Sequence, residues 1–338
     1  MNRPAKIALG VCFCMALLPV AILACLVIFG TSEPPQPLSS VTNPFAAMDY
    51  TGLPSIDRYQ ARDGAALSYR TYSAGEKQVA VLIHGSAGSS SNMHALAVAL
   101  QRAGITVYVP DLRGHGANLP HGNIDYTGQL DDDMADFLSS ANSKYPHAKW
   151  TLIGFSSGGG FALRIAASPI GLAFDNYILL SPFLRYDAPT VRAERTNADV
   201  PAAKEQAWSR AYTPRIIGLL LLNAIRIHRL DGLPVIAFAV PPNVPSVTTT
   251  YSWRMLQNFQ PHDNFTADIR SVSKPMTVLV GGDDQVFIPA EFEQVFHVDA
   301  GREDIPVTIL PGLGHSDMIT SPLAIQAVVL ASGNRSPR

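Results

Sequence analysis

Six short runs of apolar residues recur along this chain, separated by stretches with helical spacing. Short runs without polar residues are typical of strands buried on both faces, as in parallel sheets. Strands that alternate with helices predict an α/β domain, a mostly parallel sheet flanked by helices. The runs are residues 79–83, 105–109, 150–153, 177–180, 276–280 and 307–310, and the helical stretches include 92–102, 127–141, 159–167 and 322–331.

Ahead of these runs, residues 58–61 and 65–72 flank an Asp63-Gly64 pair. Glycine readily adopts the positive φ of a tight hairpin turn, so this pair predicts two antiparallel strands at the start of the sheet. We expect the folded domain to begin near Asp49, with a core of residues 49–181 and 270–338.

The alternation is interrupted once, over residues 182–269. An ordinary loop has about 4 to 6 residues, so a segment of this length predicts an inserted subdomain, or cap. A helix-like run at 216–227 and an apolar run at 233–240 lead us to expect a helical cap. The uncharged part of the helix-like run, 216–225, is too short for a membrane span, which favours an amphipathic, partly lipid-facing cap.

The N-terminus carries an uncharged apolar run over residues 7–29, preceded by Arg3 and Lys6. A helix of that length is about 34 Å long, enough to cross a hydrocarbon core of about 30 Å. The length of the run leads us to expect that residues 1–30 are an uncleaved single-pass membrane anchor. Because the positive residues precede the run, we expect the folded domain on the non-cytoplasmic side. A cleaved signal peptide and a secreted domain are the alternative. Residues 31–48, rich in Pro and Ser, predict an extended tether.

Composition narrows the chemistry available to the folded domain. The net charge is −2, from 25 basic and 27 acidic residues, so we expect no nucleic-acid partner. All three cysteines precede residue 26, so the rest of the chain can form neither a disulfide nor a thiolate zinc site. The glycines at 154–160 do not form a dinucleotide-binding pattern. We expect no cofactor and no metal, and a nucleophile based on oxygen or nitrogen.

The strongest motif is G-x-S-x-G at residues 154–158, directly after an apolar run and before a helical stretch. A tight strand-to-helix turn of this kind exposes a serine hydroxyl, and small residues on both sides permit its strained backbone. Ser156 has glycines two positions before and after it, whereas the neighbouring Ser157 does not. The pattern predicts Ser156 as a catalytic nucleophile.

A serine nucleophile needs a base, and the base needs a carboxylate that holds its tautomer. His315 follows the run at 307–310, and Asp283-Asp284 follows the run at 276–280. The carboxyl ends of parallel strands meet at one edge of a sheet, where α/β proteins place their sites. We predict His315 as the base. Because successive side chains alternate in direction, only one of the two aspartates can face it, and the pattern alone leaves open which one.

Stabilising a reacting oxyanion requires two backbone N–H donors, one of them from the residue after the nucleophile. Ser157 supplies that donor. The second is expected from the HGSAG loop at 84–88, at Ser86, while His84 is expected to brace the loop.

The segments HGSAG (84–88), DLRGHG (111–116), GFSSG (154–158), GGDDQVF (281–287) and LPGLGH (310–315) occur in the order seen in α/β-hydrolases. DLRGHG in particular resembles the lysophospholipase and monoacylglycerol lipase branch, to which serine aminopeptidases are also similar. The resemblance covers residues 58–331 apart from the cap. It implies a triad of Ser156, Asp284 and His315 and an oxyanion hole formed by Ser86 and Ser157.

The same resemblance implies that Arg113 and His115 brace the neighbouring loop. One departure from it is Ala117-Asn118, where many relatives carry a serine two residues after the motif. We interpret this difference as a change in loop packing and not in chemistry.

Together these features predict a serine hydrolase that cleaves carboxylic esters, and the resemblance, cap and anchor favour a lipid or another apolar acyl ester. A peptidase or amidase is the first alternative, because acidic cap side chains can bind a free amino terminus. A noncatalytic binding protein on the same fold is the second, although it has no need of all three triad residues. The acidic cap residues are Asp187, Glu194, Asp199, Glu205, Asp231 and Asp263.

Overall fold

The computed structural model describes residues 17–192 and 207–333 of the chain. Its centre is an eight-stranded sheet of order β1-β2-β4-β3-β5-β6-β10-β11, in which the first three strands pair antiparallel and the others parallel. The expected hairpin and mostly parallel sheet are confirmed. The strands are β1 (Asp57–Gln60), β2 (Ala66–Tyr72), β3 (Gln78–Ile83), β4 (Thr106–Pro110), β5 (Lys149–Phe155), β6 (Asn176–Leu180), β10 (Met276–Gly281) and β11 (Val307–Leu310).

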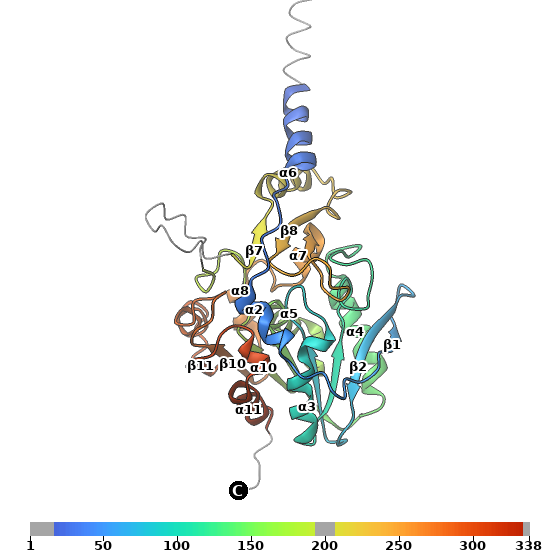
Figure 1. The fold of residues 1–338 in the computed structure, drawn as a ribbon, viewed down its shortest axis with the longest axis vertical. Helices are drawn as coiled ribbons and strands as arrows, with labels where there is room; N and C mark the ends of the chain where they lie inside the picture. The colour runs from blue at the N-terminus through green and yellow to red at the C-terminus, as the bar shows by residue number, and fades with distance from the viewer. Residues whose placement is uncertain (1–16, 193–206, 334–338) are drawn as a thin grey trace, which may run out of the picture.

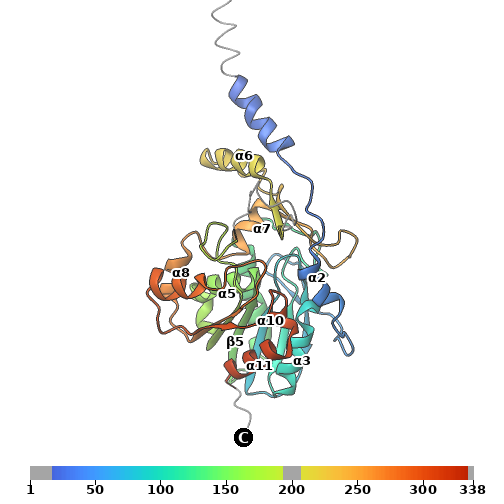
Figure 2. The same cartoon turned by 60° about the vertical axis from the view of Figure 1, so that its left-hand side comes forward.

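Helices cover both faces of the sheet (Figure 2). Alternate residues of β3 show why its run is wholly apolar: Val81 packs in one core cluster and Leu82 in the other. One face carries α4 (Gln129–Asn142), α5 (Ser157–Ala166) and α8 (Phe265–Ser271), and the other carries α3 (His94–Arg102), α10 (Asp317–Thr320) and α11 (Pro322–Ala331). Shorter helical turns are η1 (Ser90–Met93), η2 (Pro169–Ala173), α9 (Glu291–Glu293) and η3 (Gln294–Asp299).

The extended tether expected over residues 31–48 is wrong for its second half, where helix α2 (Ser39–Ala46) forms. Val41 in this helix is buried, and its carbonyl accepts a hydrogen bond from the Ser316 hydroxyl at 2.8 Å. The Leu38 N–H, just before the helix, donates to the Ala239 carbonyl at 2.8 Å. Contacts with distant parts of the chain therefore stabilise a helix that has no local periodicity.

The cap holds a three-stranded antiparallel sheet of order β7-β8-β9, so the expectation of a helical cap is wrong in this respect. Its middle strand falls in the apolar run at 233–240, whereas the outer two are too short to carry a pattern. The elements are β7 (Ser209–Ala211), α6 (Thr213–Ala224), β8 (Pro234–Phe238), β9 (Thr250–Ser252) and α7 (Trp253–Asn258). Residues 193–206 of the predicted insertion lie outside the described residues, and its boundaries stay a prediction.

A helix over residues 17–29, called here the N-terminal helix, projects from the end of the molecule that carries α6 (Figure 1). Within residues 17–192 and 207–333, no helix combines the length and apolar character that a membrane crossing requires. Residues 7–16 of the expected span lie outside the described residues. The anchor stays a prediction.

Candidate active site

Ser156 stands between β5 and α5 in a backbone conformation that non-glycine residues rarely adopt, with φ 55° and ψ −120°. Three backbone hydrogen bonds hold it there. Its N–H donates to the Leu180 carbonyl at 2.9 Å, and its carbonyl accepts from the N–H groups of Phe183 at 2.9 Å and Gly160 at 3.1 Å. The surrounding strands and helix therefore maintain a strained turn, as is common at functional sites.

The glycines of the motif are required by close approach of the backbone. A Cβ atom at Gly154 would lie 2.1 Å from the Gly158 carbonyl oxygen, and one at Gly158 would lie 2.3 Å from the His84 carbonyl oxygen. No side chain fits at such distances. The pattern in the sequence thus reflects the packing of this turn against the strand that precedes the HGSAG loop.

Ser156, His315 and Asp284 come from the ends of β5, β11 and β10 and form a chain of hydrogen bonds. The Ser156 Oγ lies 3.0 Å from His315 Nε2, and His315 Nδ1 lies 2.8 Å from Asp284 Oδ2. The three residues are only 3%, 2% and 1% exposed. Because the carboxylate accepts the Nδ1 proton, Nε2 is free to accept the serine proton, which is the arrangement that activates a hydroxyl.

The two adjacent aspartates differ in environment. Asp284 Oδ1 accepts the N–H groups of Val286 at 2.8 Å and Phe287 at 2.9 Å, whereas Asp283 is exposed. Burial alone would raise the pKa of Asp284, but the His315 ring and these hydrogen bonds outweigh it and lower the pKa below its usual value. The carboxylate that contacts His315 is therefore held in its charged form.

Sequence reasoning missed several residues that orient this group. The backbone N–H of His315 donates to Gln285 Oε1 at 3.0 Å. The imidazole contacts the rings of Phe155 and Phe287, whose centroids lie 4.8 and 5.1 Å from its own. The Arg192 guanidinium donates to the Asp284 carbonyl oxygen at 2.9 Å. Gln285 and Phe287 lie within GGDDQVF, but nothing in the sequence pairs Arg192 with that segment.

The two predicted oxyanion donors, Ser86 and Ser157, lie side by side, with their hydroxyl oxygens 2.5 Å apart. Ser157 is the first residue of α5, where backbone N–H groups have no acceptor within the helix. The N-terminal end of a helix also favours negative charge. This position next to Ser156 suits an N–H donor to a developing oxyanion.

The cap holds the loop that carries Ser86. The next residue, Ala87, has a positive φ of 61°, which is unusual for a residue with a side chain. Its N–H donates to the Tyr251 hydroxyl oxygen at 2.9 Å, and its carbonyl accepts the Thr248 N–H at 3.2 Å. Tyr251 is buried, and its hydroxyl lies 2.6 Å from His115 Nε2. Neither Thr248 nor Tyr251 belongs to a recognisable motif.

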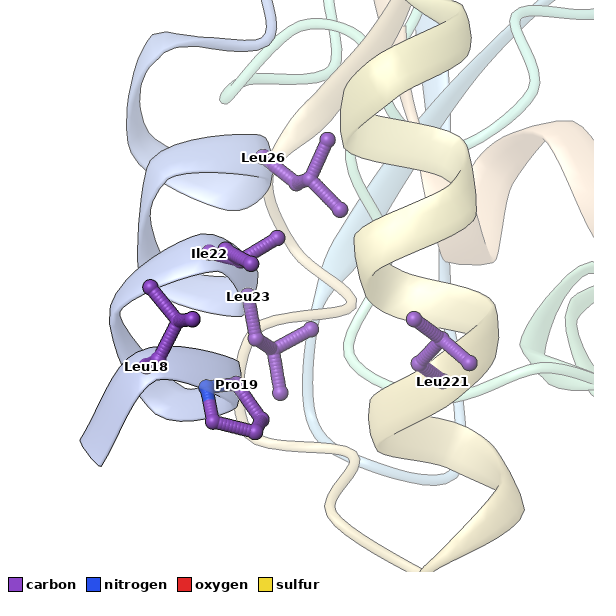
Figure 3. Close-up of a pocket in the computed structure, with 6 residues that line it drawn as sticks. All are labelled: Leu18, Pro19, Ile22, Leu23, Leu26 and Leu221. Carbon is purple, nitrogen blue, oxygen red and sulfur yellow. The ribbon is translucent and has the colours of Figure 1, made fainter. Parts of the chain in front are cut away.

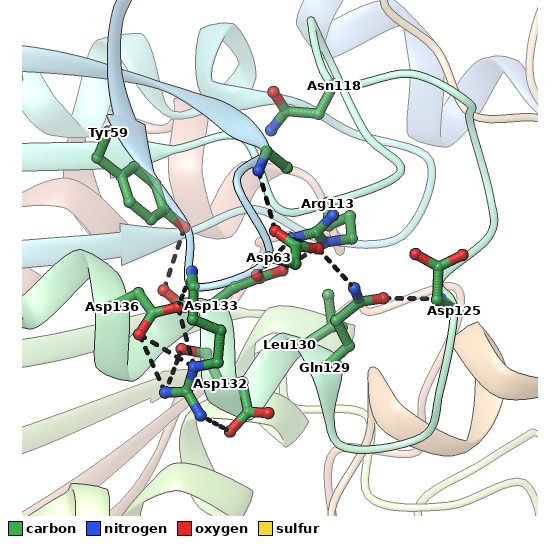
Figure 4. Close-up of polar contacts among 12 residues, drawn as sticks. Tyr59, Asp63, Arg113, Asn118, Asp125, Gln129, Leu130, Asp132, Asp133 and Asp136 are labelled. Carbon is green, nitrogen blue, oxygen red and sulfur yellow. Dashed lines mark hydrogen bonds and ion pairs between the residues drawn. The ribbon is translucent and has the colours of Figure 1, made fainter.

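Arg113 ties the DLRGHG segment to the core (Figure 4). Its guanidinium forms two hydrogen bonds of 2.8 Å with the buried Asp133 of α4 and an ion pair of 3.0 Å with Asp63 of the hairpin. The Asp133 hydrogen bonds raise the pKa of Arg113 despite partial burial, so the charge is retained. These contacts hold the segment in place through a buried carboxylate, Asp133, and a partly exposed one, Asp63.

The two buried histidines of this region contact each other, with ring centroids 4.8 Å apart. His84 Nε2 accepts the Leu112 N–H at 3.2 Å, and its Nδ1 lies 2.9 Å from the Gly85 carbonyl oxygen. Burial lowers the pKa of His84, and burial together with the His84 ring lowers the pKa of His115 well below its usual value. Both rings are therefore neutral. His84 connects the HGSAG loop to the DLRGHG segment, and His115 connects that segment to Tyr251 of the cap.

Asn118, at the departure from the family pattern, is buried. Its Oδ1 accepts the Ser68 N–H at 3.0 Å, and its Nδ2 donates to the Asp111 carbonyl at 2.6 Å.

Within the described parts of the chain, no group of three His, Cys, Asp or Glu side chains is placed to hold a metal ion.

Residues 74–319 match the family described as serine aminopeptidase, S33. The chain belongs to this family. The match covers well over half of the chain and includes the serine turn, both aspartates and His315. It confirms the α/β-hydrolase resemblance drawn from the motifs.

Among curated proteins, the sn-1-specific diacylglycerol lipase ABHD11 of Danio rerio is 30% identical over 146 residues, which are 41% of this chain and 44% of that relative. A soluble variant of Saccharomyces cerevisiae monoglyceride lipase is 19% identical, with a TM-score of 0.62 over 86% of this chain and 99% of that one. Paleococcus ferrophilus monoacylglycerol lipase is 18% identical, with a TM-score of 0.56 over 80% and 99%. The solved structures establish a shared fold.

Proposed function

We propose that this chain is a carboxylic ester hydrolase that uses Ser156 as nucleophile, His315 as general base and Asp284 as orienting acid. The observation that carries the proposal is the chain of two hydrogen bonds, 3.0 and 2.8 Å long, that links these three side chains across three strand ends. His315 accepts the serine proton as Oγ attacks the ester carbonyl. The imidazolium then donates that proton to the leaving alcohol, an acyl-enzyme forms, and water activated by His315 hydrolyses it.

The negative charge on the former carbonyl oxygen is stabilised in this proposal by the N–H groups of Ser86 and Ser157. Removing one such donor in a hydrolase typically costs about 10² to 10³ in kcat. Their adjacent side chains and the helix N-terminus beside Ser157 support this role.

For the substrate, we propose a lipid or another apolar acyl ester, met at a membrane to which residues 1–30 anchor the chain with the folded domain on the non-cytoplasmic side. The diacylglycerol lipase and monoglyceride lipases among the similar proteins support a lipid substrate. Exposed aliphatic side chains on the N-terminal helix and on α6 support a lipid-rich location.

An ester is favoured over a peptide because two of these acidic cap side chains, Asp187 and Asp231, already have partners. Asp187 is paired with Arg185 at 2.7 Å, and buried Asp231 accepts from Asn223 at 2.7 Å. Asp263 is exposed. The remaining acidic cap residues, Glu194, Asp199 and Glu205, lie outside the described residues.

The test combines a fluorophosphonate probe with a substrate series. Labelling requires an activated hydroxyl, so Ser156→Ala is expected to abolish it, while the matched variant Ser157→Ala retains it. p-Nitrophenyl esters of increasing acyl length are expected to be hydrolysed, and aminoacyl arylamides are not. Labelling that survives in Ser156→Ala, or arylamide cleavage faster than ester cleavage, would contradict the proposal.

A further inference from the structure

Helix α6 exposes a row of aliphatic side chains. Ile217, Leu220 and Leu221 lie on one face and are between 46% and 52% exposed, and Ile225, directly after the helix, is 64% exposed. The opposite face, with Leu219 and Leu222, is buried. A helix that is apolar all round is normally enclosed by protein or by lipid. With 12 residues, about 18 Å of helix, α6 is too short to cross a bilayer.

The N-terminal helix adds to the same apolar surface. Leu18, Val20, Ile22 and Phe29 are between 51% and 74% exposed. Figure 2 shows α6 lying across the lower end of this helix, at the end of the molecule opposite the C-terminus. The two helices therefore present their exposed side chains at one end of the protein, a concentration that typically marks an interaction site.

Arg215 fixes the two helices to each other and to the cap sheet. Its buried guanidinium donates to the carbonyls of Val27 at 2.8 Å, Ile28 at 3.1 Å and Pro234 at 2.9 Å. A Cβ atom at Gly218 would lie 2.7 Å from the Val27 side chain, which shows how closely α6 approaches. Close packing against the N-terminal helix therefore holds α6 in place.

Between the helices lies an open groove of about 350 Å³ lined entirely by aliphatic residues and a proline (Figure 3). Its lining comprises Leu18, Pro19, Ile22, Leu23, Leu26 and Leu221. Such a lining offers no partner for a polar ligand, whereas a hydrocarbon chain is matched to it.

Beyond the end of α6, the exposed residues alternate in character. Arg226 and Arg229 stand among the exposed apolar residues Ile225, Ile227 and Leu230. Cationic side chains beside an apolar face are typical of helices that lie in the plane of a membrane interface and contact anionic headgroups. The charge of this turn therefore complements an anionic lipid surface.

We propose that α6 is an interfacial membrane helix: acyl chains cover its exposed face and enter the groove, while Arg226 and Arg229 contact anionic headgroups. This rests on the proposed membrane location and adds a second attachment, in the cap itself. The N-terminal helix is the second part of the uncharged run over residues 7–29, so the sequence that packs against α6 belongs to the predicted anchor. The cap then faces the lipid from which an apolar ester would come.

The test places a tryptophan on α6 of the full chain, reconstituted in phosphatidylcholine vesicles that contain phosphatidylglycerol. Leu221→Trp reports on the groove, and Leu172→Trp is the matched control, because Leu172 is 69% exposed in η2 at the far end of α5 from Ser156. The parent chain gives the background from Trp150, Trp208 and Trp253. Brominated phosphatidylcholine is expected to quench most of the added emission at position 221 and none at position 172.

Equal quenching at both positions overturns the proposal. The proposal is also overturned if neither the brominated lipid nor aqueous acrylamide quenches the emission of the tryptophan at position 221, because protein then covers the exposed face of α6. Arg226→Glu/Arg229→Glu in the Leu221→Trp background is expected to lose quenching in vesicles with phosphatidylglycerol, and unchanged quenching contradicts the headgroup contact. Hydrolysis of p-nitrophenyl acetate by the same samples reports separately on Ser156 chemistry, so a failure of the proposed function is distinguishable.

Discussion

The core and the cap contribute to the candidate site in different ways. The core places Ser156, Asp284 and His315 at the ends of β5, β10 and β11, whose parallel pairing fixes the strand ends relative to one another. The cap holds the HGSAG loop through Thr248 and Tyr251, which contact both backbone polar groups of Ala87. The sheet therefore positions the candidate triad, whereas the HGSAG loop depends on contacts with an insertion that contains short strands.

The largest expected effect comes from removing the acid that the core supplies. Asp284→Asn is expected to lower kcat by about 10⁴, because an amide cannot hold the base in its reactive tautomer. The matched variant Asp283→Asn changes an exposed carboxylate one residue away and is expected to stay within about tenfold, or about 1.4 kcal/mol in the barrier. Ester hydrolysis by folded protein, verified by circular dichroism, gives both values. The reverse ranking would move the orienting role to Asp283.

A smaller effect is expected from the cap. Tyr251→Phe removes the hydroxyl that accepts the Ala87 N–H, so the loop with Ser86 is less firmly held and kcat should fall by about tenfold, near the upper end of the value of one hydrogen bond. Tyr177→Phe is the matched control, since that hydroxyl donates to the Gly171 carbonyl at 2.7 Å in the core. Both variants should lower Tm, but only Tyr251→Phe should lower kcat. If Tyr251→Phe and Tyr177→Phe had equal kcat values, the contact between the cap and the HGSAG loop would have no part in the reaction.

The last expected effect is on folding and not on the reaction rate: a pH dependence of stability at the junction of cap and core. Burial lowers the pKa of His84 and His115, so below about pH 6.5 the unfolded chain binds protons that the native protein does not. Stability should therefore be full above that pH and fall as pH decreases, by about 1.4 kcal/mol per pH unit for each histidine. The groups facing them are Asp111, Arg113, His121 and Tyr251.

Urea unfolding at several pH values measures this slope. His115→Gln keeps an acceptor for the Tyr251 hydroxyl but does not titrate, so it is expected to lower the slope. The depressed pKa of Asp284 acts in a separate window, because that contribution is present above the ordinary carboxyl pKa of about 4 and is lost as pH falls further. A slope unchanged by His115→Gln would assign the dependence to other groups.

Much of the core and of the candidate site could be predicted because the relevant signals are local. A run such as 79–83 is apolar throughout since both faces of β3 are buried, and Gly64 adopts a φ of 85° at the turn that the Asp63-Gly64 pair predicted. Gly154 and Gly158 stand where backbone atoms leave no room for a side chain. Such requirements act on individual residues and are therefore visible in the sequence.

Local patterns predict the alternating fold, the serine turn and the strand ends that bear aspartate and histidine, because burial and backbone sterics constrain each of these locally. Three contacts are visible only in the folded chain: Asp284 with His315, the Val41 carbonyl of α2 with Ser316, and Tyr251 with the HGSAG loop. Each of these contacts joins residues far apart in the chain. Hydrogen bonds of this kind depend on distance in space, and no periodicity or spacing in the sequence records that distance.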